Sequence, residues 1–192
     1  MKSLLLMTLL SFAFVSCGSN KKTDAEKNEA TVKSMTAPPV DEKEKKSQDL
    51  KKAPQLTLEQ MRRLLPQELD SAKEKNFQAS TQFGYGLAAV EYPKTRTKSI
   101  KVTLYDCAGE LGSVNYFENY WNHLNAQNQT ETEFKKTIDF EGGKAVETYK
   151  KDMNLSTITF VIRDRLVIVM EGKNMPPEEL EVVAKKLHDK IV

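Results

Sequence analysis

The chain of 192 residues is poor in cysteine and tryptophan: it has two cysteines, Cys17 and Cys107, and one tryptophan. Its one long apolar run, from Leu4 to Val15, is too short to cross ~30 Å of bilayer hydrocarbon as a helix. The formal net charge is +2, and the arginines are scattered along the chain. This near-neutral balance argues against nucleic acid as a partner.

Motifs of known chemistry are also missing. The chain contains no His-Glu-x-x-His, Cys-x-x-Cys, Asp-rich calcium loop or Gly-x-Ser-x-Gly sequence. His123 and His188 each stand on a predicted helix without a second ligand at metal spacing. We therefore predict no catalytic residue, no metal site and no cofactor, so that the chain is not an enzyme.

The first residues have the order of a secretory signal peptide. Lys2 supplies a cationic start, the apolar run follows, and Ser16 is the small residue before the cut, so the signal peptide is residues 1–16. Val15-Ser16-Cys17 resembles the lipobox that signal peptidase II recognises in bacterial lipoproteins, with Phe14 where leucine is usual. The resemblance implies acylation at Cys17, with palmitate among the acyl chains. Two or more chains make a stable membrane anchor.

Residues 17–54 are predicted to form the lipidated cysteine and a disordered tether. From Gly18 to Pro54 there is no aromatic residue and few large aliphatic ones, so the segment cannot bury enough surface to offset its ordering entropy. Gly18 directly after the cysteine implies the outer membrane, by the sorting rule of the resembled family. Acylation of Cys17 leaves Cys107 without a partner in the chain, either as a small buried apolar residue or as a reactive or intermolecularly paired thiol.

Residues 55–192 fit one domain. Thr57-Leu58-Glu59-Gln60 has the form of a capping box and predicts a short helix, and an apolar stripe from Leu180 to Ile191 predicts a final helix after Pro176 and Pro177. Alternating or apolar segments predict strands at residues 82–92, 100–104, 134–140, 145–150, 158–162 and 166–170.

The expected fold class is α+β. We predict an antiparallel sheet of about six strands packed by N-terminal, middle and C-terminal helices. The layout resembles PsbP-like envelope domains.

The middle helix carries the aromatic residues of greatest interest. Ser113 is predicted to cap a helix with Val114, Phe117, Trp121 and Leu124 on one face. Tyr116 and Tyr120 flank this stripe. We identify Tyr116, Tyr120 and Trp121 as a possible binding surface, while the alternative is that the stripe packs on the sheet.

These observations predict a lipid-anchored lipoprotein of the cell envelope that binds a protein or a small amphiphilic ligand and does not catalyse a reaction. Two alternatives stay open. One is an envelope enzyme with an unrecognised site, which a cluster of His123 with Cys107 or acids would indicate. The other is a structural or assembly component of an envelope complex.

Overall fold

The computed structural model describes residues 40–192. The predicted signal peptide, Cys17 and the tether as far as residue 39 lie outside the described residues. Within residues 40–192, no helix combines the length and the apolar character needed to cross a membrane.

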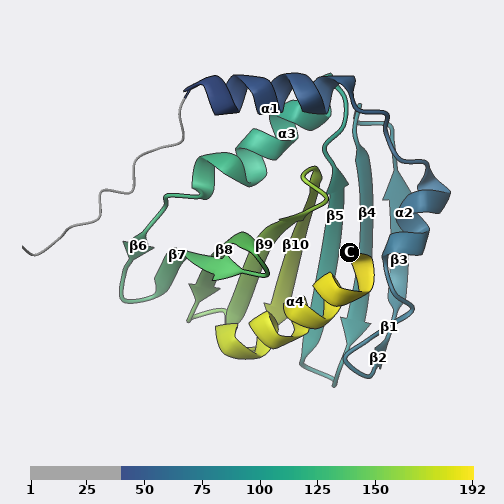
Figure 1. Cartoon of the computed structure of the whole chain (residues 1–192). Helices are drawn as coiled ribbons and strands as arrows, with labels where there is room; N and C mark the ends of the chain where they lie inside the picture. The colour runs from purple at the N-terminus through teal and green to yellow at the C-terminus, as the bar shows by residue number, and fades with distance from the viewer. Residues whose placement is uncertain (1–39) are drawn as a thin grey trace, which may run out of the picture. The chain divides into compact units, whose positions relative to one another are not determined.

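Helices and strands follow one another as shown in Figure 1. Their bounds are α1 Val40–Lys52, α2 Leu58–Leu64, β1 Glu68–Leu69, β2 Ala72–Lys73, β3 Lys75–Ser80, β4 Gly86–Pro93, β5 Ser99–Asp106, α3 Glu110–Asn119, the 3₁₀ helix η1 Trp121–His123, β6 Asn128–Gln129, β7 Glu133–Phe140, β8 Gly143–Lys150, β9 Leu155–Ile162, β10 Leu166–Lys173 and α4 Pro177–Ile191.

The main sheet confirms the predicted α+β class. It has eight strands in the order β3-β4-β5-β10-β9-β8-β7-β6, and β1 pairs with β2 in a separate two-stranded sheet. Every pairing is antiparallel. Two meanders, β3 to β5 and β6 to β10, therefore meet where β10 pairs with β5. The prediction of about six strands missed β3 and β6, and the predicted strand 82–92 begins only at Gly86.

Successive side chains of a strand point to opposite faces, so the sheet has two distinct surfaces. The α4 face is the one that carries Val90, Val102, Ile168 and Phe160. All four are buried together with side chains of α2 and α4. This face forms the large core of the domain, and Figure 1 shows α4 crossing it.

The opposite surface, the α3 face, is covered only in part. Near the β9–β10 turn, Val167 is buried in a small cluster with Tyr116 and Phe117 of α3. Farther along the strands, Glu91, Lys101 and Glu171 form a charged row across β4, β5 and β10. Exposed and half-buried polar residues thus replace the apolar core on much of this face.

Helix α1 corrects the predicted tether, because residues 40–52 are helical rather than disordered. Acidic residues in the first turn and lysines in the last turn suit the helix dipole. Leu50 is buried in the α3 cluster, Ser47 Oγ lies 3.0 Å from Ser113 Oγ, and Lys51 pairs with Glu110 at 3.1 Å. Figure 1 shows α1 lying along α3, so contact with α3 stabilises a helix that is polar almost throughout.

Helix α3 differs from the prediction in its start and its buried face. It begins at Glu110, so Ser113 lies inside the helix and is buried instead of capping it. A Cβ on Gly112 would lie 2.5 Å from the carbonyl carbon of Cys107, so this glycine permits close contact between helix and strand end. Val114 is exposed, whereas Tyr116 and Phe117 are buried. The apolar face is rotated from the predicted stripe.

Candidate functional site

The β9–β10 turn lies between two hollows at one end of the sheet. Its central residues, Arg163 and Asp164, have φ angles of 51° and 60°, and Arg165 N–H donates to the Ile162 carbonyl at 3.3 Å. Two consecutive positive φ values are typical of a type I′ turn, which asparagine and glycine favour. An arginine held in this conformation is an unusual choice for such a turn, which draws attention to its side chain.

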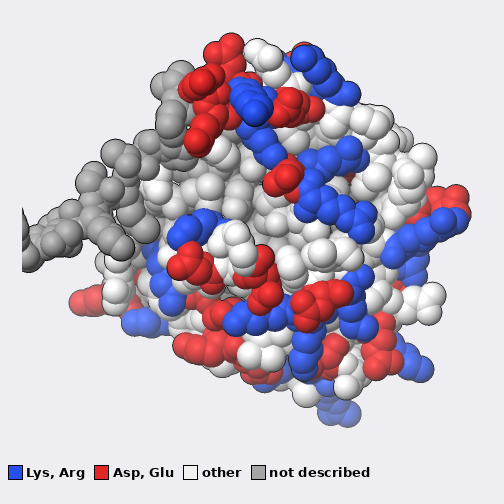
Figure 2. Space-filling model, viewed as in Figure 1, with Lys and Arg blue, Asp and Glu red and all other residues white. Residues whose placement is uncertain are grey.

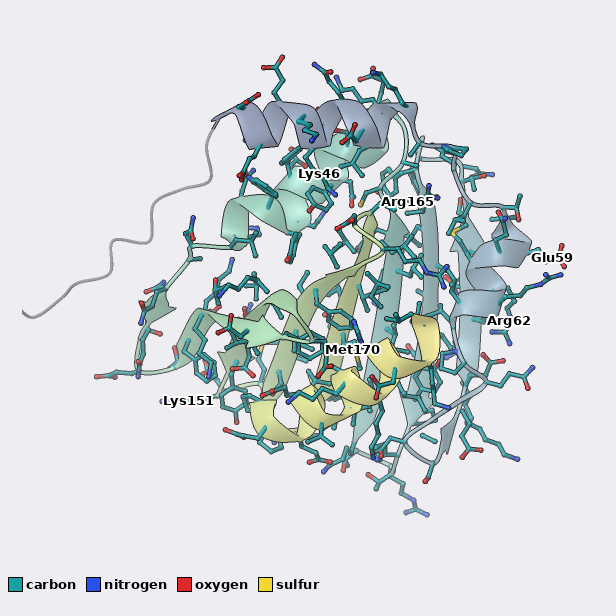
Figure 3. All side chains as sticks on the ribbon, in the orientation of Figure 1. Lys46, Glu59, Arg62, Lys151, Arg165 and Met170 are labelled. Atoms are coloured by element: carbon teal, nitrogen blue, oxygen red, sulfur yellow. The ribbon has the colours of Figure 1, made fainter. Side chains whose placement is uncertain are left out.

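The first hollow, here called the arginine pocket, has a volume of about 430 Å³. It is lined by Pro54, Gln55, Leu56, Gln60, Arg163, Arg165 and Leu166. The lining thus combines apolar side chains, two amides and two guanidinium groups, and it contains no acidic residue. Figure 3 shows Arg165 at this end of the sheet, below α1.

Arg165 is fixed by a buried carboxylate. Its Nε lies 3.0 Å from Asp106 Oδ1 and its Nη2 donates to Oδ2 at 3.1 Å. Asp106 is fully buried and also accepts the Leu56 backbone N–H at 2.6 Å. One carboxylate therefore joins β5, the β9–β10 turn and the segment before α2. This ion pair holds the guanidinium rigidly at the pocket wall, with little entropy left to lose on ligand binding.

Arg163 brings a second positive charge to the same pocket. Its Nη2 donates to the Ile191 carbonyl at 2.7 Å, at the C-terminal end of α4. The neighbouring Asp164 has an exposed side chain that faces Lys46 Nζ at 4.0 Å. Of the two arginines, Arg165 is neutralised by Asp106, whereas Arg163 faces a carbonyl. Figure 2 shows basic side chains gathered in this part of the surface. The net positive charge can attract a carboxylate or phosphate.

The second hollow, the tyrosine pocket, has a volume of about 140 Å³. Its walls are Tyr116, Tyr120, Phe140, Glu141, Gly143, Lys144, Phe160, Val161, Asp164 and His188. Tyr120 directly follows α3, and its hydroxyl donates to the Lys144 carbonyl at 2.8 Å, which ties the end of this helix to β8. Burial raises the pKa of Tyr120 to about 12 and also raises the pKa of Tyr116.

The predicted surface of Tyr116, Tyr120 and Trp121 is corrected by these contacts. Tyr116 and Tyr120 are only 4% and 6% exposed, and Trp121 is half-buried in η1. The three rings do come together, since the Tyr116 centroid lies 5.7 Å from that of Tyr120 and 6.1 Å from that of Trp121. They belong to the small core under α3, and two of them form a pocket wall instead of an open surface.

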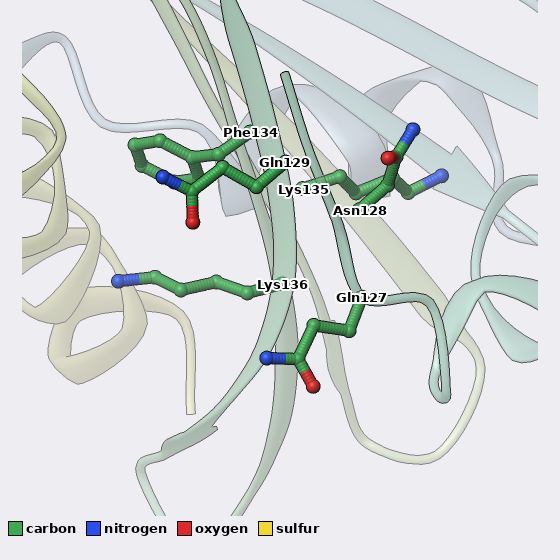
Figure 4. A pocket seen from close by; sticks show the side chains of 6 residues that line it. All are labelled: Gln127, Asn128, Gln129, Phe134, Lys135 and Lys136. Atoms are coloured by element: carbon green, nitrogen blue, oxygen red, sulfur yellow. The ribbon is translucent and has the colours of Figure 1, made fainter. Parts of the chain in front are cut away.

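A third hollow of about 230 Å³ lies at the sheet edge formed by β6 and β7, shown in Figure 4. It contains two lysines, but both have partners elsewhere. Lys136 Nζ lies 2.8 Å from a carboxylate oxygen of Glu147, and Lys135 Nζ lies 2.9 Å from His123 Nδ1. Glu147 thus neutralises one of the two lysines, and this hollow is smaller than the arginine pocket.

Cys107 and His123 do not form a nucleophile and base pair. Cys107 is fully buried, as the first of the two interpretations predicted, and burial raises the pKa of its thiol to about 12. His123 Nδ1 faces Lys135 instead. Because the thiolate is the reactive form of cysteine, this environment disfavours nucleophilic chemistry at Cys107.

No sequence motif identifies the arginines of the pocket. Arg163 and Arg165 belong to the scattered basic residues of the chain, and their spacing around a hairpin turn is the one local signal that marks them. Comparison with models of protein families, with curated proteins and with solved structures finds no match to this chain.

Proposed function

We propose that this protein is a lipid-anchored lipoprotein of the cell envelope, at the outer membrane, whose domain binds an amphiphilic anion without catalysing its conversion. The arginine pocket carries the proposal. Its two guanidinium groups suit a carboxylate or phosphate head, and Pro54, Leu56 and Leu166 offer apolar contact to the adjoining part of the ligand. The lipobox-like sequence supports the location.

The pocket is built to hold an anion in a fixed position. Arg165 is held by Asp106, and Arg163 is held by the end of α4, so the two charged groups are set by contacts that do not involve the ligand. Such preorganisation lowers the entropy cost of binding. The Gln55 Nε2 amide donates to Gly84 and Ala108 carbonyls, which fixes the opposite wall.

Binding is tested with octanoate, octyl phosphate and inorganic phosphate, followed by calorimetry and by amide chemical-shift mapping. We expect octyl phosphate to bind, with shifts at residues 54–60 and 163–166, and Arg163→Gln to weaken binding at least tenfold. Arg96→Gln changes an exposed arginine in another turn and serves as the matched control. Absence of binding by all three probes, or equal binding by Arg163→Gln and the wild type, would contradict the proposed ligand class.

The anchor is tested separately by growing cells with labelled palmitate. The wild-type protein is expected to carry the label and to fractionate with the outer membrane, and Cys17→Ala is expected to lose both properties. A wild-type protein without label would refute the anchor while leaving the binding proposal to be judged on its own titration.

A further inference from the structure

A group of metal-binding side chains lies where the last turn of α4 meets the β7–β8 turn. Glu141 comes from the β7–β8 turn, and His188 and Asp189 are neighbours near the C-terminal end of α4. One ligand atom from each of the three residues can be chosen so that all lie within 4.8 Å of one another. The group stands at the edge of the tyrosine pocket, which Glu141 and His188 line.

The imidazole of His188 supplies an independent observation. Its Nδ1 is buried and has no hydrogen-bond partner among the described residues. The ring lies beside the packed pair Phe140 and Phe160, with centroids 6.0 and 6.4 Å away. Leaving a buried polar atom unpaired costs roughly 1–3 kcal/mol, and such atoms are rare in folded proteins. A bound cation at Nδ1 would remove this cost.

The surrounding charges favour a cation. Two carboxylates face the imidazole, with Asp189 Oδ1 3.8 Å from Nδ1, and the C-terminal end of α4 adds the negative end of its dipole. Lys144, which lines the same pocket, pairs with Asp139, and Lys185 of α4 lies 2.9 Å from Glu181. Arg163 is turned to the Ile191 carbonyl.

We propose that Glu141, His188 and Asp189 form a binding site for a divalent transition-metal ion of the zinc class. One imidazole nitrogen and two carboxylate oxygens are a donor set that zinc accepts, with a fourth position left for water or a ligand. Ligand bonds of about 2.0–2.2 Å require the three atoms to approach one another by roughly 1 Å. The Glu141 and Asp189 side chains are exposed and free to rotate, so this adjustment needs no movement of the core.

The zinc proposal does not depend on the arginine pocket. The two sites share no lining residue. A result against either one therefore leaves the other unchanged.

The test is a titration of the full chain with Zn²⁺, read by competition with a chromophoric chelator and by thermal unfolding. All variants carry Cys17→Ser so that a free thiol there does not bind the metal. We expect one Zn²⁺ per chain, a rise in melting temperature on saturation, and little competition from Mg²⁺, which prefers oxygen ligands.

The chain's two histidines provide a matched pair of variants. We expect His188→Gln to lose zinc binding and the thermal shift, and His123→Gln to retain both. Should His188→Gln fail to fold, Glu141→Gln and Asp189→Asn still test the site, because they change exposed side chains and keep the fold. Each is expected to weaken binding at least tenfold, while Glu178→Gln at the start of α4 leaves it unchanged. Two results would overturn the site. One is no zinc binding at 100 micromolar metal, which is about a hundredfold above a micromolar dissociation constant. The other is zinc binding that survives both carboxylate changes.

Discussion

The two faces of the sheet are built on different principles. The α4 face is apolar from β4 to β9 and is closed by α2 and α4. The α3 face is closed only near the β9–β10 turn, where α3 packs on it and α1 packs on α3. The first arrangement gives the domain most of its buried apolar surface, and hence most of its stability. The second buries fewer apolar side chains, so we expect the layer of α1 and α3 to open more readily than the main core.

The largest expected difference between the faces is measured by two neighbouring residues of β10. Ile168 points to the α4 face and is fully buried, whereas Val169 points to the α3 face and is half-buried. We expect Ile168→Ala to lower the free energy of unfolding by about 4 kcal/mol and Val169→Ala by about 1 kcal/mol or less. Urea unfolding measures both, and equal losses would show that the faces contribute alike.

A second, smaller effect is expected at the close contact of α3. Gly112→Ala places a Cβ against the backbone of Cys107 and should lower the free energy of unfolding by about 3 kcal/mol. Neither α3 nor the chain after β5 can move away without disturbing the cluster around Cys107. Gly143→Ala is the matched control, since its new Cβ would lie 3.7 Å from the nearest atom, the Phe140 carbonyl oxygen. A Gly112→Ala protein as stable as Gly143→Ala would mean that α3 is only loosely held.

The third prediction concerns opening of the α1 and α3 layer. Leu50 and Cys107 share one buried cluster. Leu50→Ala should therefore lower the free energy needed to open the layer of α1 and α3 by about 2 kcal/mol. Because Cys107 reacts only when the layer is open, its reaction with a thiol reagent should become roughly thirtyfold faster. Peptide mass spectrometry distinguishes Cys107 from Cys17. If Leu50→Ala leaves the rate unchanged, the reagent reaches Cys107 by another route. The proposed opening of the α1 and α3 layer would then be wrong.

The fourth prediction concerns the Cys107 thiol, whose contribution to stability changes only at alkaline pH. Its pKa is raised from 9.0 to about 12 by burial, so the unfolded chain loses the proton before the folded one does. The contribution is fully present below pH 9 and is lost as the pH rises toward 12. We expect Cys107→Ala to show a shallower fall in melting temperature over this interval. A part of the fall remains, because buried tyrosines such as Tyr120 act in the same direction.

Local sequence patterns predicted the parts of the fold whose residues interact with near neighbours. The capping box at Thr57 and Gln60 is present, with Thr57 N–H donating to Gln60 Oε1 at 2.8 Å and Gln60 N–H to Thr57 Oγ1 at 3.2 Å. The stripe from Leu180 to Ile191 is buried in α4. The hairpins of the second meander follow the expected alternation.

The missed elements depend on distant residues. Helix α1 has Leu50 as its buried apolar residue, and the surface that buries it belongs to α3. Strand β3 carries Phe77 as its large apolar side chain, and the Arg62 guanidinium of α2 lies 4.4 Å from that ring. Neither segment has the periodic apolar pattern from which a helix or strand is predicted.

The sites were hidden for the same reason. Gln55 and Arg163 line one pocket, and Glu141 and His188 form one cluster, yet no motif links residues so far apart in sequence. Tyr116 and Tyr120 were recognised as a group, but the sequence did not show that α3 turns them inward. A local pattern states which residues share a helix face and leaves open what that face contacts.

The junction between the two meanders has a consequence for how the chain folds. Within each meander, neighbouring strands are also consecutive in sequence, but β10 must find β5 across α3 and four intervening strands. Closing so long a loop is entropically costly, and it yields contacts only once both meanders exist. We therefore expect the β5 and β10 pairing, with Leu104 opposite Ile168, to form late and to limit the folding rate. Arg165 and Asp106 lie at one end of this junction, so the arginine pocket is completed only when the sheet closes.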